Sequence, residues 1–374
     1  GNSNLTASLV FGEAAGGGMA VKVAGTSNGS RIALDYGVND LAKLTGDAKV
    51  NLSATIENPQ AQILLGQAGL DPLPIGGGEG GRLQFSVNGT GGEPADATLT
   101  VAAGRTTLSA RGKIGLAAAG FPKGSGAIKL ESPDLEPYLM MTGIVLPQGG
   151  AGLPARLGAE LVLGEGKAEI SAVDAEAAGN RIGGALSVDW NGAVPKVGGE
   201  LALDSVDLGW LAEGVLGPVT DGATGGLATT PLPKPRSDFD FNLALKAQNF
   251  TAGTLGPITS FSASLNGAGG QMTLEEATGQ WLGGTMSGRL MVANTDGNGF
   301  YQGRISLRQA DLSAVERAIG RVAEAGVLEG RLDLDLVAEA TGTSVSDLLA
   351  ATNGSGTGKV AALTVRRLDS GLLS

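Results

Sequence analysis

The chain has 374 residues and a formal net charge of −11, and it contains neither cysteine nor histidine. Without these residue types it has no disulfides, no thiolate metal sites and no histidine-based acid–base catalysis. The acidic balance argues against nucleic acid as a partner, because proteins that bind nucleic acid present a basic surface. Hydrophobic residues make up 42% of the chain, which is enough to bury a sizeable core despite 64 glycines.

We expect the chain to be a fragment of a longer protein, with both of its ends internal to that protein. The first residues lack the basic and apolar regions of a signal peptide. No apolar run approaches the roughly 20 residues of a transmembrane helix.

Alternation of apolar and polar residues dominates the chain and predicts antiparallel strands with one apolar and one solvated face. In chain order, the clearest runs are residues 82–88, 238–246, 304–308 and 331–336. Pairs typical of hairpin turns follow several runs. These pairs are Asn88-Gly89, Asn191-Gly192, Asn266-Gly267 and Asp296-Gly297.

Three short helices are predicted. The first has Pro59 as its first residue and continues to Leu65. The second covers residues 311–325, with Ser313 and Glu316 placed as a capping box. The third begins at Ser344 and stops at Asn353-Gly354.

A longer repeat is superimposed on the strand pattern. The form G-x-φ-x-L-x-x-x-D-L, in which φ is an apolar residue, occurs at residues 126–135, 199–208 and 303–312, with a looser copy at 32–41. The aspartate of each copy is interpreted as a cap for a helical turn rather than as a ligand. Such self-similarity predicts repeated β modules. Their expected bounds are 1–71, 72–146, 147–216, 237–326 and 327–374, with a Gly/Pro-rich linker or loop at 217–236.

Motifs that resemble catalytic signatures lack the context that the chemistry needs. The G-x-S-x-G at residues 25–29 has no histidine to activate its serine and is read as a turn. The G-x-G-x-x-G at 76–81 follows a Pro-rich stretch instead of a strand and is read as a linker. Residues 354–359 resemble a phosphate loop, but Val360 stands where Ser or Thr must bind Mg²⁺, so this segment is read as a helix stop and turn.

Paired carboxylates are not read as catalytic, because a glycosidase needs two acids that converge on one cleft. Two pairs, Asp238 with Asp240 and Asp333 with Asp335, are read as solvated side chains on polar strand faces. Adjacent Glu275 and Glu276 are expected to point to opposite faces of a strand. We therefore expect no catalytic residues, no metal site and no cofactor, and the chain is not expected to be an enzyme.

The order of several pieces resembles the C-terminal region of AsmA-like proteins. These pieces are residues 265–267, 272–274, 281–288, 303–307 with Asp311-Leu312, 332–334, 341–349 and 351–356. The resemblance covers most of the chain, is clearest from about Leu201 onwards and is weakest before about Asn51.

The resemblance implies a bacterial envelope protein in the periplasm, anchored to the inner membrane by an N-terminal helix that this chain lacks. It also implies a bridge-like β groove that carries phospholipids or other acyl lipids towards the outer membrane, with possible periplasmic or outer-membrane partner proteins. The family offers no catalytic residues.

The expected fold is therefore mainly β: a long curved antiparallel sheet that forms an elongated apolar groove from repeated strand modules, with a few short helices. A sheet of about 25 strands would have an apolar face on the order of 2,000 Å², far more than soluble monomers expose. A second sheet, a partner chain or acyl chains must cover this face. The residues predicted to line the groove are Leu83, Phe85, Val87, Phe239, Phe241, Leu243, Leu245, Leu265, Met272, Leu274, Ile305, Leu307, Leu332, Leu334 and Leu336. The alternative is a structural or adhesive secreted β repeat with a closed, dry core.

Overall fold

The computed structural model describes residues 5–14, 17–43, 46–70, 79–90, 93–115, 123–141, 152–235, 239–320 and 328–366. The chain divides into two compact units, Gly1–Asn191 and Gly192–Ser374. This division falls inside the module predicted for residues 147–216.

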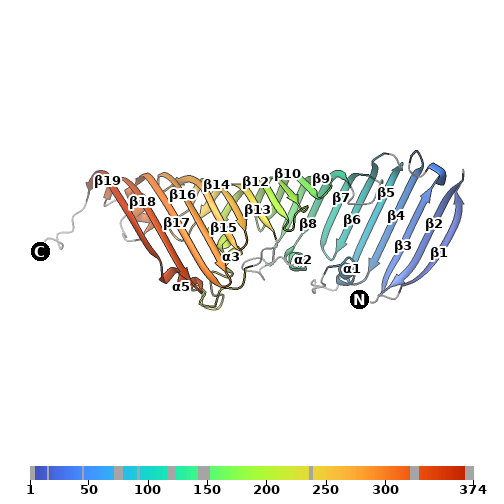
Figure 1. Cartoon of the computed structure of the whole chain (residues 1–374), viewed down its shortest axis with the longest axis horizontal. Coiled ribbons are helices and arrows are strands. Elements are labelled where there is room, and N and C mark those ends of the chain that lie inside the picture. The colour runs from blue at the N-terminus through green and yellow to red at the C-terminus, as the bar shows by residue number, and fades with distance from the viewer. Residues whose placement is uncertain are drawn as a thin grey trace. The chain divides into compact units, whose positions relative to one another are not determined.

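Unit 1 is an open sheet in which every strand pairs antiparallel with the next one in the chain (Figure 1). Its strands are β1 (Leu5–Ala14), β2 (Gly18–Ser27), β3 (Ser30–Val38), β4 (Lys49–Asn58), β5 (Gly81–Thr90), β6 (Ala95–Ala103), β7 (Thr106–Ile114), β8 (Gly124–Ser132), β9 (Ala155–Gly164), β10 (Lys167–Ala177) and β11 (Asn180–Asp189).

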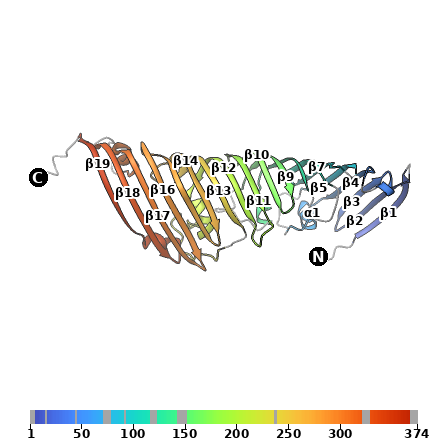
Figure 2. The ribbon, with the colours of Figure 1, turned by 45° about the horizontal axis from the view of Figure 1, so that its top comes forward.

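Unit 2 is likewise a sheet in which consecutive strands pair, and its strands lie side by side in both views (Figures 1 and 2). They are β12 (Lys196–Asp207), β13 (Asp240–Thr251), β14 (Ile258–Ala268), β15 (Gln271–Trp281), β16 (Gly284–Thr295), β17 (Asn298–Asp311), β18 (Leu328–Gly342) and β19 (Asn353–Val365). The pairs from β13 to β19 are antiparallel, whereas β12 and β13 are parallel.

The helices are short and all follow strands. They are η1 (Leu41–Lys43, a 3-10 turn), α1 (Ala61–Gln67), α2 (Glu136–Met141), α3 (Leu208–Leu216), α4 (Leu312–Ala318) and α5 (Val345–Ala350). The predicted mainly β fold, with antiparallel pairing and a few short helices, is confirmed.

Two of the predicted turns are correct and two are wrong. Asp296 and Gly297 both have positive φ and connect β16 to β17, and Asn191-Gly192 follows β11. Asn88-Gly89 and Asn266-Gly267 instead lie within β5 and β14, where Asn88 pairs with Asp96 and Gly267 pairs with Met272. In both places the alternating strand continues past the pair, so ladder hydrogen bonds outweigh the local turn preference.

The helix starts are shifted from the predicted ones. Helix α1 begins at Ala61, because the Asn58 side chain accepts a hydrogen bond from the Gln60 amide and holds Pro59 in a turn before the helix. Helix α4 is capped by Asp311 and not by a box of Ser313 and Glu316. Helix α5 begins as predicted, with the Ser344 side chain accepting from the Asp347 amide at 3.0 Å.

Aspartates of the repeat act as caps, as predicted. Asp207 accepts a hydrogen bond from the Trp210 amide, and Asp311 accepts one from the Ser313 amide. Asp134 and Asp40 bond in the same way to the amides two residues ahead. The repeated D-L corner is therefore the place where a strand turns into a helix.

A crossover segment, residues 208–235, explains the parallel pair of β12 and β13. Because these strands run in the same direction, the chain must return to the row of strand ends where β12 began. Helix α3 starts at the far end of β12, and the Asn294 side chain near the end of β16 donates to the Val215 carbonyl at 3.1 Å. The strand directions place Asn294 on the opposite row of strand ends. The segment predicted as a linker at 217–236 belongs to this crossover.

Candidate functional site

One face of the unit 1 sheet is almost entirely apolar. Residues that pair across neighbouring strands lie on the same face, so the register defines rows of side chains. One such row, from β1 to β9, is Leu9, Val23, Leu34, Ala54, Phe85, Leu99, Ala110, Ile128 and Ala159. A parallel row is Phe11, Val21, Tyr36, Leu52, Val87, Ala97, Gly112, Gly126 and Leu161. We call this surface the unit 1 face.

The opposite face carries the polar residues of the same strands. Its central row is Lys22, Asp35, Ser53, Ser86, Thr98, Arg111, Ala127 and Glu160. Lys22 and Asp35 form an ion pair at 3.3 Å, and the hydroxyls of Ser86 and Thr98 are 2.6 Å apart. This side of the sheet therefore faces water, although it also carries exposed Val10 and Val162.

Among the described residues of unit 1, much of the apolar face remains open. Helices α1 and α2 cover it near one row of strand ends, where Leu65 and Met141 share a small buried cluster with Ala103. A second small cluster on the same face, Val87, Ala95 and Ala97, is buried near the other ends of β5 and β6. Larger side chains away from these helices are only half-buried, among them Leu83, Phe85 and Leu99, and Phe11 is 67% exposed. A closed core would bury such residues.

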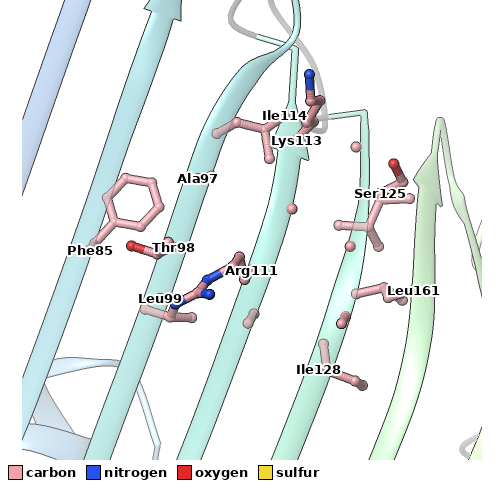
Figure 3. A pocket seen from close by; sticks show the side chains of 16 residues that line it. Phe85, Ala97, Thr98, Leu99, Arg111, Lys113, Ile114, Ser125, Ile128 and Leu161 are labelled. Atoms are coloured by element: carbon pink, nitrogen blue, oxygen red, sulfur yellow. The ribbon is translucent and has the colours of Figure 1, made fainter.

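A hollow with a cavity volume of about 140 Å³ lies on this open part, over β5 to β9 (Figure 3). Its walls include Phe85 and Leu99 on one side and Leu161 on the other, with Ile128 between them. Leu163, two residues after Leu161 on β9, also lines it. The register pairs Gly112 with Gly126 at its centre. A side chain at Gly112 would collide with the Ser125 carbonyl and the Gly126 Cα, so the close approach of β7 and β8 requires glycine there. Neither glycine contributes a side chain to the space above this pair.

Unit 2 also has one apolar face, and the register brings most of the predicted lining residues onto it. Leu243, Leu265, Leu274 and Leu290 form one row, and Met286, Leu307 and Leu334 form another. Phe241 pairs with Gly267, which pairs with Met272. We call this surface the unit 2 face.

The crossover segment covers a large part of the unit 2 face. Leu216, Ala228 and Leu232 of this segment belong to one buried cluster with strand residues of the face. Leu245 is 4% exposed and Leu307 is 2% exposed. The side chain of Asn294, 1% exposed, donates to Pro233 at 2.7 Å as well as to Val215, and so fastens both arms of the crossover to β16. This part of unit 2 is a packed core.

The predicted lining residues therefore occupy three environments. Leu83 and Phe85 are half-buried on the open unit 1 face, next to buried Val87. The packed part of the unit 2 face holds Phe241, Leu243, Leu245, Leu265, Met272, Leu274, Leu307, Leu332 and Leu334. Ile305 and Leu336 lie on the same face but are 40% and 41% exposed, and Phe239 is exposed just before β13, with its ring 6.1 Å from that of Phe241.

Several residues that line the hollow were not predicted from the sequence. Leu99, Ala110, Ile128 and Leu161 line the hollow but were not among the predicted residues. The signal was present, because residues 95–101 and 108–114 alternate between apolar or small residues and polar ones, as the run at 82–88 does. Small residues such as Ala and Gly make the alternation less conspicuous, and they are also what makes the hollow.

The remaining sequence motifs that fall on described residues have structural roles. Residues 25–29 end β2 and form the turn to β3, with Asn28 and Gly29 at positive φ. Residues 354–359 lie within β19, so reading them as a turn was wrong: they pair with β18 from Ala338 to Asp333. Gly76 to Gly78 and Asp238 lie outside the described residues.

The other carboxylate pairs bond to neighbouring strands. Asp335 accepts from Arg308 at 2.7 Å and from Ser306 at 2.6 Å, and these hydrogen bonds, the one from Arg308 foremost, lower the pKa of Asp335. Asp333 accepts from the Gln309 amide, and Glu275 forms an ion pair with Arg289 at 3.4 Å. Asp333 and Asp335 thus tie β18 to β17. Within the described parts of the chain, no cluster of three or more Asp or Glu residues is arranged to hold a metal ion.

Among the described helices, none is long and apolar enough to cross a membrane. Comparison of the chain with family models, with curated proteins and with solved structures finds no match.

Proposed function

We propose that this chain holds or conducts acyl lipids on an apolar β groove, as a periplasmic segment of an AsmA-like protein anchored to the inner membrane. In this proposal it passes phospholipid acyl chains between the inner and outer membranes and so supports outer-membrane assembly. The envelope location rests on the sequence resemblance. The lipid-holding role rests on one structural observation, the uncovered unit 1 face.

The size of this face supports the proposal. Eleven strands at a spacing of ~4.8 Å extend ~50 Å, and strands of about ten residues are ~30 Å long. Even allowing for the helices, the apolar face is on the order of 1,000 Å², whereas soluble monomers rarely expose more than a few hundred. Something apolar must cover it, and acyl chains match a surface that has large aliphatic side chains but few polar groups.

Burial of hydrocarbon would favour the binding of acyl chains to this face. Each methylene moved from water onto an apolar surface contributes about 0.8 kcal/mol when fully buried. An open face that buries only part of each chain gives a smaller gain, which suits a surface on which lipids must also move.

The alternative remains a structural or adhesive β repeat with a closed core. The packed cluster beneath the crossover in unit 2 favours it for that part of the chain. The half-buried leucines of the unit 1 face favour the lipid proposal, so the two functions make different predictions for unit 1.

The test is to purify the protein from a bacterial envelope, extract bound lipid, and separate the extract by thin-layer chromatography. We expect wild-type protein to carry phospholipid. Leu99→Asp places a charge on the unit 1 face and should remove most of this lipid, because an ionised carboxylate against hydrocarbon costs several kcal/mol. Thr100→Asp is the matched control, since Thr100 is exposed on the opposite face of β6.

Melting curves of the three proteins complete the experiment. Lipid loss in Leu99→Asp with a modest change in melting temperature supports an open groove. Wild-type protein without lipid, or a Leu99→Asp variant that unfolds, would instead favour the closed-core alternative.

A further inference from the structure

We infer that the hollow over β5 to β9 is a discrete seat for one unbranched acyl chain, which lies across the strands with its polar head outside the seat. This inference rests on the proposed function and deepens it, because it states where on the unit 1 face a chain is held and in what form. Three features of the hollow carry it: its length, its volume and its lining.

The length of the hollow fits one acyl chain. Its lining comes from five adjacent strands, from Phe85 on β5 to Leu163 on β9. Four strand spacings of ~4.8 Å extend ~19 Å. The hydrocarbon core of a bilayer is ~30 Å thick, so one acyl chain spans ~15 Å. A chain laid across the strands is therefore accommodated from end to end.

The volume of the hollow fits part of one acyl chain. Its volume of about 140 Å³ is close to that of an apolar protein cavity that takes up benzene, roughly 150 Å³. The deepest part would thus enclose about six carbons, and the remainder of the chain would lie on the open face. The floor is made by Gly112 and Gly126, whose close approach leaves a trough without side chains.

The lining selects for hydrocarbon. The side chains that the register places on this face around the hollow are Phe85, Ala97, Leu99, Ala110, Ile114, Ile128, Leu161 and Leu163. Thr98, Arg111, Lys113, Ser125 and Ala127 also border it, but they are the alternating residues whose side chains belong to the opposite face. A buried polar headgroup would find no side-chain hydrogen-bonding partner on the floor, so the head must remain outside.

Ala110 offers a way to fill the seat without disturbing the sheet. It lies on β7 between Leu99 and Ile128 in the register, is half-buried and lines the hollow. Ala110→Leu adds three carbons into open apolar space, and filling such a space leaves stability unchanged or raises it. Ala127→Leu is the matched control, because Ala127 lies on the neighbouring strand β8 but on the opposite face, between Arg111 and Glu160.

The experiment is titration of delipidated protein with a fluorescent single-chain fatty acid, with native mass spectrometry to count the bound chains. We expect wild type and Ala127→Leu to bind the probe alike. Ala110→Leu should bind it about tenfold more weakly or worse, since each displaced methylene is worth about fourfold in affinity. It should also lose one bound chain per protein, with an unchanged or higher melting temperature.

The outcomes distinguish the proposed seat over β5 to β9 from the wider proposal that the unit 1 face binds lipid. If wild-type protein binds no probe, the proposed function fails and the seat fails with it. If wild type binds but Ala110→Leu binds equally well and with the same number of chains, the seat is overturned while the groove stands. Equal loss of binding in Ala110→Leu and Ala127→Leu would also overturn the seat, because it would mean that the effect does not depend on the face.

Discussion

At the scale of single residues, most polar side chains fasten strands and turns to one another. Asp207 joins the end of β12 to α3 and also accepts from the Thr251 hydroxyl of β13 at 2.7 Å. Arg308, Ser306 and Asp335 join β17 to β18. These contacts lie at strand ends or on the polar faces, so the apolar faces keep few polar groups.

The interaction of Arg308 and Ser306 with Asp335 predicts a pH dependence of stability. The pKa of Asp335 is lowered in the folded protein, mainly by the hydrogen bond from Arg308. A lowered pKa stabilises the fold above the ordinary aspartate value, and this contribution is lost as the pH falls through the folded value. Urea unfolding should therefore show wild type to be more stable than Asp335→Asn near pH 7, with the difference shrinking towards about pH 2. A difference that stays constant over this range would contradict this role of the carboxylate.

Asn294 attaches both arms of the crossover to β16. It is buried, its amide group donates to the Val215 and Pro233 carbonyls, and its oxygen accepts from the Gly297 amide at 3.0 Å. Asn294→Ala leaves these groups unpaired and should lower the free energy of unfolding by about 1–3 kcal/mol or more, measured by chemical denaturation. Exposed Asn298 makes one long hydrogen bond of 3.4 Å, so Asn298→Ala is the control and should change little. Equal effects would show that the attachment does not depend on Asn294.

At the scale of elements, the strands could be predicted from the alternation of apolar and polar residues. The connections between the strands were harder to predict. Helix α3 was missed although Leu208, Leu211, Ala212, Val215 and Leu216 follow helical spacing and pack on the buried cluster. Its nine residues are few, and the flanking alternation of β12 obscured the change of period. Missing this helix also hid the parallel pair of β12 and β13, because the crossover is the only reason for that pairing.

The sequence also could not reveal which predicted lining residues are covered. Leu245 and Leu336 both occupy alternating positions, yet one is buried and the other is 41% exposed. The difference comes from residues 208–235, which pack over one part of the unit 2 face. Alternation identifies the apolar face of a strand, but tertiary packing decides whether that face is open.

The cap of α3 provides a test at this scale. Asp207→Ala removes the side chain that accepts from the Trp210 amide and should cost about 0.5–2 kcal/mol in unfolding free energy. Asp207→Asn should retain most of the stability, because asparagine caps helices about as well as aspartate does. If Asp207→Asn is as destabilised as Asp207→Ala, the charge rather than the cap is responsible.

At the scale of the molecule, the sheet of each unit has one polar and one apolar face. The two units differ in how much of the apolar face is covered. Unit 2 covers much of its face with its own crossover segment. Unit 1 buries its face near α1 and α2 and in a small cluster around Val87 and Ala95, and leaves a hollow over β5 to β9. The lipid proposal therefore applies most directly to unit 1, although sequence reasoning placed most of the lining residues in unit 2.

The most direct measurement is photocrosslinking of lipid to single positions of β6 in living bacteria. A photoreactive phenylalanine derivative at Leu99 faces the hollow, and the same group at Thr100 faces the opposite side of the sheet. We predict that lipid adducts, detected by mass spectrometry after irradiation, form at position 99 and are absent or rare at position 100. Equal labelling of both positions, or no lipid at position 99 in a folded protein, would contradict a lipid-holding unit 1 face.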